Sequence, residues 1–246
     1  YEVPVKTITG SIRSDLILID KVIGAGEIAV SDHRSCQPTF EEIAHLAAEC
    51  RVGGLLGGKA GVLHLHLGDG PRRLEYLFRL VRETEVPASQ VIPTHVTRNP
   101  DLFAESLQWV KQGGWVDVTL GPDPDPATEP DVAFEACLTA FMDKGLPLEH
   151  ITTSSDANGS VPVFDAAGKL IGLTAATEGH LLRKFTEVVG KGLLPPEKAI
   201  RLFSTNAADF YGFKDKGRLA EGGDADIILT DGDYRLTDVF ACGRLM

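Results

Sequence analysis

Short apolar segments alternate with amphipathic segments along most of this chain. The apolar segments predict buried strands at residues 27–33, 61–68, 90–97, 115–121 and 150–156. Helical periodicity follows or separates them, at residues 41–52, 72–83, 100–113, 131–144, 177–190 and 196–210. This alternation of strand and helix predicts a parallel sheet with helices packed outside it.

Two of the predicted helices begin with a local start signal. Thr39 and Glu42 have the spacing of a capping box, in which each side chain hydrogen-bonds the backbone at the other residue. Pro71 opens the next helical segment, where the fixed backbone angle of proline suits a helix start. Both signals support helices at residues 41–52 and 72–83.

The pattern changes near the C-terminus. Residues 218–246 contain two short strand-like segments joined by a turn at Asp231-Gly232-Asp233. A small β element is therefore expected to follow the α/β part. We divide the chain into residues 1–217 and residues 218–246 on this basis.

Composition and charge restrict the class of partner. The chain has 246 residues, of which 43% are hydrophobic and 24% charged, so it can bury a sizeable core. Its formal net charge is −11, with acidic residues spread along the sequence. Nucleic acids and anionic membranes attract basic surfaces, so both are disfavoured as partners. A small molecule is favoured instead.

The sequence also predicts a location. No apolar run reaches the roughly 18–20 residues needed to span a membrane, and the first ten residues lack the features of a signal peptide. The four cysteines are scattered, without the spacing of a disulfide framework or a zinc knuckle. We therefore expect a cytoplasmic protein with reduced thiols.

Polar residues stand within or at the carboxyl ends of four predicted strands: Glu27, His66, His95 and Asp156. In a parallel barrel these ends converge on one face, so the side chains can meet around one point. Two imidazoles and two carboxylates suit zinc or a similar divalent metal. A metal would also explain a carboxylate inside an otherwise buried strand, where an unpaired charge is costly.

Each of these residues also has an ordinary structural interpretation. A histidine on a strand is more often a core or surface residue than a ligand. We assign four histidines to that majority: His33, His45, His150 and His180. His64 lies two residues before His66 and faces the same way, so either or both could bind metal, and we favour His66 because it is nearer the strand end. Asp156 could instead cap the segment that follows it.

Two arginines and a serine lie beside the same strand ends. Arg34 follows SDH, Arg98 follows THVT, and Ser160 follows SDANG. The arginines could form surface ion pairs, which contribute little. They could also bind substrate carboxylates, because the planar guanidinium matches a carboxylate with two parallel hydrogen bonds. The second interpretation predicts an anionic substrate.

The segments SDHRS, RVGGLLGGKAGV, PTHVTRN and SSDANGS, in this order, resemble isoaspartyl (β-aspartyl) dipeptidases of the amidohydrolase superfamily. The resemblance implies a (β/α)8 TIM-type barrel with a small β-sandwich. It implies two zinc ions and hydrolysis of β-aspartyl dipeptides by a metal-activated hydroxide. The expected activity is that of a zinc-dependent metallo-dipeptidase.

The resemblance also implies residue roles. His66 and His95 match ligands of the second metal, and Asp156 matches an aspartate that binds metal and acts as general base. Tyr1 matches a tyrosine that polarises the scissile carbonyl. Substrate contacts are matched by Arg34, Arg98 and Ser160.

The chain departs from the family pattern in two places. Glu27 stands where family members usually carry a carbamylated lysine that bridges the metals, with one extra residue nearby in GAGE. We expect the glutamate to bridge in its place. The HxH motif of the first barrel strand is not found, and the HLH at residues 64–66 matches the fifth strand by its flanking sequence. Five of eight barrel strands are accounted for, which predicts the C-terminal part of a longer protein.

Other functions stay open at this point. A cyclic amidase similar to dihydroorotase or hydantoinase, or an N-acyl amino acid deacylase, would use the same fold with another substrate. A non-catalytic metal-binding or scaffold protein is a further alternative, raised by the absent lysine and HxH motif. The expected partners are a small dipeptide substrate and further copies of the chain in a homo-oligomer.

Overall fold

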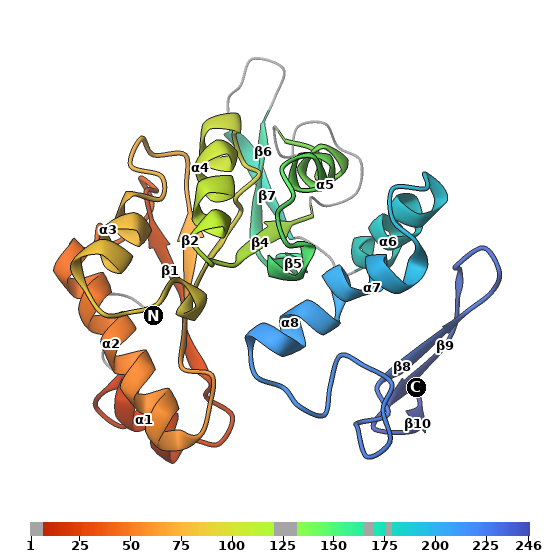
Figure 1. Ribbon diagram of the computed structural model, residues 1–246, viewed down its shortest axis with the longest axis horizontal. Coiled ribbons are helices and arrows are strands. Elements are labelled where there is room, and N and C mark those ends of the chain that lie inside the picture. Colours follow the sequence, from red (N-terminus) through yellow and green to blue (C-terminus); the bar gives the residue numbers. More distant parts are fainter. Residues whose placement is uncertain (1–6, 121–131, 165–169, 176–178) are drawn as a thin grey trace.

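The computed structural model describes residues 7–120, 132–164, 170–175 and 179–246. Tyr1 lies outside the described residues. Figure 1 shows helices α1 (Ile12–Leu18), α2 (Phe40–Gly57) and α3 (Glu75–Glu83) gathered beside the first strands, with the C-terminal hairpin at the opposite end of the molecule. In the part of the chain described, no helix is both long and apolar enough to cross a membrane.

The predicted parallel strands are confirmed. They are β1 (Gly24–Val30), β2 (Val62–Leu67), β3 (Val91–Thr94), β4 (Val116–Thr119) and β5 (Ile151–Ser154). β1, β2 and β3 pair in parallel in that order, and β4 pairs in parallel with β5. A side-chain hydrogen bond from Thr94 on β3 to Asp117 on β4 connects the two sheets. Helices between successive strands complete a β/α alternation of the kind found in a (β/α)8 barrel, with five parallel strands among the described residues.

The remaining helices follow the predicted order. They are α4 (Pro100–Lys111), α5 (Phe134–Asp143), α6 (His180–Gly190), α7 (Pro196–Phe203) and α8 (Thr205–Phe210), with 3-10 turns η1 (Ala88–Gln90) and η2 (Leu148–His150) before β3 and β5. The capping box at the start of α2 is confirmed, because the side chains of Thr39 and Glu42 each accept a hydrogen bond from the backbone N–H of the other residue. α3 begins at Glu75, three residues later than predicted, because residues 71–74 form turns.

Strand alternation separates the core from the site. In β2 the leucines Leu63, Leu65 and Leu67 are fully buried in the main hydrophobic core, together with side chains of the surrounding helices. His64 and His66 alternate with them and therefore project from the other face of the strand. The sequence VLHLHL thus packs one face of β2 against the helices and turns its histidines to the barrel interior.

One helix and one hairpin in the α/β part were not predicted. α1 precedes the first strand, and an antiparallel hairpin of β6 (Ser160–Phe164) and β7 (Leu170–Ala175) follows β5. The apolar runs VPVF and LIGL in this hairpin are only four residues long, so their periodicity is too short to distinguish from a loop.

The C-terminal hairpin is confirmed. β8 (Ile227–Thr230) and β9 (Leu236–Ala241) are antiparallel, and β10 (Arg244–Leu245) adds a further antiparallel strand. At the predicted turn, Oδ1 of Asp231 accepts hydrogen bonds from the backbone N–H groups of Asp233 and Arg235, each at 2.9 Å. The turn sequence thus fixes the hairpin locally. A domain boundary between residues 217 and 218 stays a prediction.

Candidate metal centre

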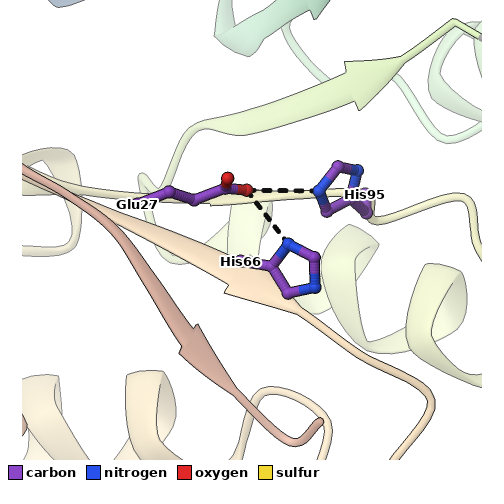
Figure 2. A group of neighbouring side chains, drawn as sticks. All are labelled: Glu27, His66 and His95. Carbon is purple, nitrogen blue, oxygen red and sulfur yellow. Dashed lines mark hydrogen bonds and ion pairs between the residues drawn. The ribbon is translucent and has the colours of Figure 1, made fainter. Parts of the chain in front are cut away.

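Glu27, His66 and His95 meet at the carboxyl-end side of β1, β2 and β3. Oε1 of Glu27 lies 3.1 Å from Nδ1 of His66 and 3.2 Å from Nε2 of His95, as Figure 2 shows. One ligand atom of each residue lies within 4.8 Å of the other two. Three of the four predicted metal ligands are therefore brought together, and Asp156 is not part of this group.

An irregularity in β1 gives Glu27 its position. The pairing with β2 runs from Ala25 opposite Leu63 to Ile28 opposite Leu65, so β1 has one extra residue in this interval. This β-bulge corresponds to the extra residue noticed in GAGE. A Cβ on Gly26 would lie 2.6 Å from Cβ of His64, so only glycine fits this approach of the two strands.

His95 lies directly after β3 and is buried. Its backbone has a φ of 61°, in the left-handed region that is unfavourable for residues other than glycine. Nδ1 of His95 lies 2.7 Å from Oγ1 of Thr119, while its Nε2 faces Glu27. The strained backbone and the hydroxyl contact together aim Nε2 at the centre of the cluster.

The neighbouring histidines keep Glu27 ionised. Burial raises the pKa of the Glu27 carboxyl, but the hydrogen bonds and the positive charge available from His66 and His95 outweigh it. The net result is a pKa well below the usual range of a glutamate. Glu27 therefore presents an anionic oxygen at neutral pH, which is the form that binds a cation.

Asp32, in the loop after β1, contacts the other side of His66. Its Oδ2 lies 3.0 Å from Nε2 of His66, and its two oxygens accept hydrogen bonds from the backbone and the guanidinium of Arg34. Burial raises the pKa of the Asp32 carboxyl, and the hydrogen bonds from Arg34 and His66 more than reverse this, so the net shift is downward. Sequence reasoning used the SDHR segment for Arg34 and missed Asp32, whose position two residues before the arginine was the available signal.

The other predicted site residues are placed as follows. Arg34 is exposed and paired with Asp32. Arg98 is half-buried, and its backbone N–H donates to the carbonyl of His95 at 3.0 Å. Asp156 is exposed just beyond β5, with a φ of 52°. Ser160 opens β6, and its side chain lies outside the described part of the structure.

His64 is separate from the cluster. Its Nδ1 lies 3.4 Å from the hydroxyl of Tyr211, and its buried Nε2 has no hydrogen-bond partner among the described residues. Burial lowers the pKa of His64, and the positive charge of the nearby histidines lowers it further, against opposing effects of Asp117 and Glu27. The structure therefore distinguishes the two histidines of VLHLHL, with His66 beside Glu27 and His64 beside Tyr211.

The donor set fits a divalent metal such as zinc. It consists of one anionic oxygen and two imidazole nitrogens, which is a common zinc ligand combination. Tetrahedral zinc with bonds of about 2.0–2.2 Å holds its ligand atoms roughly 3.4 Å apart. The observed separations of 3.1 and 3.2 Å from Glu27 are close to this value. Three protein ligands leave a coordination position open for water or substrate.

Comparison with known proteins agrees with this geometry. Residues 149–244 match the model of the Amidohydrolase family. The structure is similar to a β-aspartyl dipeptidase from Fervidobacterium islandicum AW-1 in complex with β-Asp-Leu dipeptide, with 40% identity, a TM-score of 0.89 and all of this chain covered. A second structure of the Fervidobacterium islandicum AW-1 β-aspartyl dipeptidase matches with 37% identity and a TM-score of 0.86 over the whole chain. An allantoinase from Salmonella gallinarum is 22% identical over 210 residues, which are 85% of this chain.

The fold is therefore similar to that of the two β-aspartyl dipeptidase structures. The resemblance to β-aspartyl dipeptidases is confirmed by the two similar structures. The chain spans 62% and 61% of those two proteins, and 42% of the allantoinase.

Proposed function

We propose that this chain forms part of a metal-dependent hydrolase of β-aspartyl dipeptides. The main support is the cluster of Glu27, His66 and His95. It lies in a chain whose sequence is 40% identical, over its whole length, to a β-aspartyl dipeptidase of similar structure. That relative was solved with a β-Asp-Leu dipeptide, which supports a substrate of the same kind here.

Glu27, His66 and His95 would hold the metal, with Asp156 as a further ligand. The proposed complement is two zinc ions, with the carboxylate of Glu27 as the bridge between them. Glu27 supports this role because its Oε1 already faces both histidines and a carboxylate has a second oxygen to offer. Metal bound there would supply Lewis acidity and make water nucleophilic near neutral pH.

The protein's own residues would then handle protons and orient the substrate. Asp156 would take a proton from the attacking water and pass it to the leaving amine, acting as general base and then general acid. Tyr1 would donate a hydrogen bond to the oxygen of the scissile carbonyl. Both roles rest on the family resemblance.

Substrate selection would come from the cationic and hydroxyl groups. A β-aspartyl dipeptide carries two free carboxylates, one on the aspartyl residue and one at the C-terminus. Arg34, Arg98 and Ser160 would bind these groups. An α-linked dipeptide presents one of these carboxylates elsewhere and would leave one of these groups without its carboxylate partner, which weakens binding.

The wider setting of the protein is also proposed. A cytoplasmic location and a homo-oligomeric state remain part of the proposal, together with the small dipeptide as partner and the two-domain division of residues 1–217 and 218–246. Cyclic amides are included in the substrate panel because the chain is 22% identical to an allantoinase. This similarity supports them less strongly than the dipeptidase structures support β-aspartyl dipeptides.

A substrate panel tests this function. The full-length protein, loaded with zinc, would be assayed with β-Asp-Leu, α-Asp-Leu, an N-acyl amino acid and allantoin, before and after chelation. We expect hydrolysis of β-Asp-Leu that chelation abolishes and added zinc restores, with α-Asp-Leu cleaved far more slowly. Preferred cleavage of another substrate would overturn the specificity, and zinc binding without any hydrolysis would favour a non-catalytic protein.

A further inference from the structure

A buried carboxylate lies behind the candidate metal centre on β4. Asp117 is buried and accepts hydrogen bonds from three hydroxyls: Thr152 at 2.6 Å on Oδ1, and Thr94 at 2.6 Å and Ser154 at 2.5 Å on Oδ2. These lengths are typical of O–H···O⁻ bonds, which are shorter than bonds between neutral groups. Asp117 therefore acts as the acceptor in all three of these hydrogen bonds.

The hydroxyl contacts continue from Asp117 to His95. Oγ1 of Thr94 lies 3.1 Å from Oγ1 of Thr119, and that oxygen lies 2.7 Å from Nδ1 of His95. Thr119 and Ser154 are also 3.5 Å apart at their hydroxyls. A chain of contacts thus runs from the carboxylate on β4 to a candidate metal ligand after β3.

Each hydroxyl in this series of contacts has a single proton, so the direction of each hydrogen bond can be worked out. Thr94 and Ser154 give their protons to Asp117, which leaves both able only to accept from Thr119. Thr119 satisfies these contacts when it donates to Thr94. Its lone pair then accepts a hydrogen bond from Nδ1–H of His95. The opposite direction would set lone pairs of Thr119 and Thr94 against each other at 3.1 Å.

We propose that Asp117, acting through Thr94 and Thr119, fixes the tautomer of His95. The proton is held on Nδ1, which leaves Nε2, the nitrogen in contact with Glu27, as the ring atom through which His95 would bind a metal. This is the tautomer that can bind a metal through Nε2, and a hydrogen bond on the other ring nitrogen is a common way to orient a metal-binding histidine. Asp117, Thr94 and Thr119 are then positioning residues. The assignment rests on the proposed metal centre, but it concerns proton position and not hydrolysis.

Thr119→Val tests the proposal, because valine keeps the shape of threonine and removes the hydroxyl. Zinc affinity of the full-length protein would be measured by competition with a chromogenic chelator. We expect about a 10- to 100-fold loss of affinity, the usual effect of removing such a partner. Thr119→Ser restores the hydroxyl and should bind zinc as the wild type does. A control variant, Thr152→Val, removes a buried hydroxyl bonded to the other oxygen of Asp117, outside the path to His95.

The tautomer itself can be observed. Nitrogen NMR of 15N-histidine-labelled protein at pH 8, with and without zinc, should show the His95 proton on Nδ1 in the wild type, Thr119→Ser and Thr152→Val. Thr119→Val should lose this preference when zinc is absent. A wild-type His95 that carries its proton on Nε2 and none on Nδ1, or unchanged affinity and tautomer in Thr119→Val, would overturn the proposal. Because neither readout needs a substrate, a protein without dipeptidase activity would leave the test intact.

Discussion

His66 and Asp32 are in direct contact, with Nε2 of the imidazole 3.0 Å from Oδ2 of the carboxylate. The same Oδ2 lies 2.9 Å from the guanidinium of Arg34. One buried carboxylate therefore orients a candidate metal ligand and a candidate substrate-binding arginine. Since Nδ1 of His66 faces Glu27, the hydrogen bond to Asp32 leaves Nδ1 as the nitrogen available to a metal.

Asp32→Asn should weaken both functions together. The amide keeps the size of the side chain but removes the charge that holds Arg34 and His66. We expect zinc affinity to fall about 10-fold or more, with a rise in KM for β-Asp-Leu. Chelator competition and steady-state kinetics measure the two effects. A change in KM with unchanged zinc affinity would show that Asp32 does not support His66.

The free energy of unfolding should depend on pH through the ionisation of Asp32. Its pKa in the folded protein is lowered, because the hydrogen bonds from Arg34 and His66 outweigh the opposing effect of burial. Its contribution is then fully present above the unfolded pKa of about 3.9, and it is lost as pH falls through the folded value. In metal-free protein, urea unfolding should show the wild type more stable than Asp32→Asn by about 1–3 kcal/mol at pH 7. The difference should narrow as pH falls below about 4, and a constant difference would contradict this assignment.

Gly26→Ala should disturb the metal centre through the backbone. The added methyl would lie 2.6 Å from Cβ of His64, so β1 must shift at the residue before Glu27. We expect weaker zinc binding and a lower melting temperature. Gly190→Ala is the matched control, because nothing lies within 4 Å of its added Cβ and alanine favours the helix there. Equal behaviour of the two variants would contradict the tight strand approach.

Arg98→Ala should impair catalysis without loss of metal. Arg98 is half-buried and directly follows the HVT segment that contains His95, and its backbone N–H donates to the carbonyl of that histidine. We expect kcat/KM on β-Asp-Leu to fall about 100-fold, as for removal of a charged partner worth about 3 kcal/mol, while the zinc content stays unchanged. Arg82→Ala, on the exposed surface of α3, serves as the control. Full activity of Arg98→Ala would refute its substrate-binding assignment.

Cysteine reactivity tests the packing of the fold. Cys50 and Cys137 are buried, and burial raises the pKa of each thiol to about 12, whereas Cys36 and Cys242 are exposed. Because the thiolate is the reactive form, a thiol reagent should label Cys36 and Cys242 rapidly in native protein. Labelling of the other two should require unfolding. Mass spectrometry identifies the modified residues, and rapid labelling of Cys50 in native protein would contradict its place in the core.

The regular part of this fold was predictable from local sequence. The five parallel strands, the capping box at Thr39 and the turn at Asp231 all carry signals within a few residues. The β6 and β7 hairpin was missed because its apolar runs are short. The bulge in β1 appeared in the sequence only as an extra residue beside Glu27, and its geometry depends on pairing with β2.

The site was predictable to a smaller extent. Glu27, His66 and His95 could be grouped because parallel strand ends converge, and the structure brings them together. Asp32 and Asp117 could not be grouped with the site in this way. Asp32 contacts His66, which is 34 positions away in sequence, and Asp117 contacts Thr94, which is 23 positions away. Such contacts are set by strand order and register, which a residue pattern in one segment does not contain.

The central claim is that Glu27, His66 and His95 bind one metal ion in common. Anomalous diffraction at the zinc edge, from crystals of the zinc-loaded full-length protein, tests it directly. We expect a peak about 2.0–2.2 Å from Oε1 of Glu27, Nδ1 of His66 and Nε2 of His95, and its loss in Glu27→Ala. A fully loaded protein with no zinc at these three atoms, or a peak unchanged in Glu27→Ala, would contradict the account.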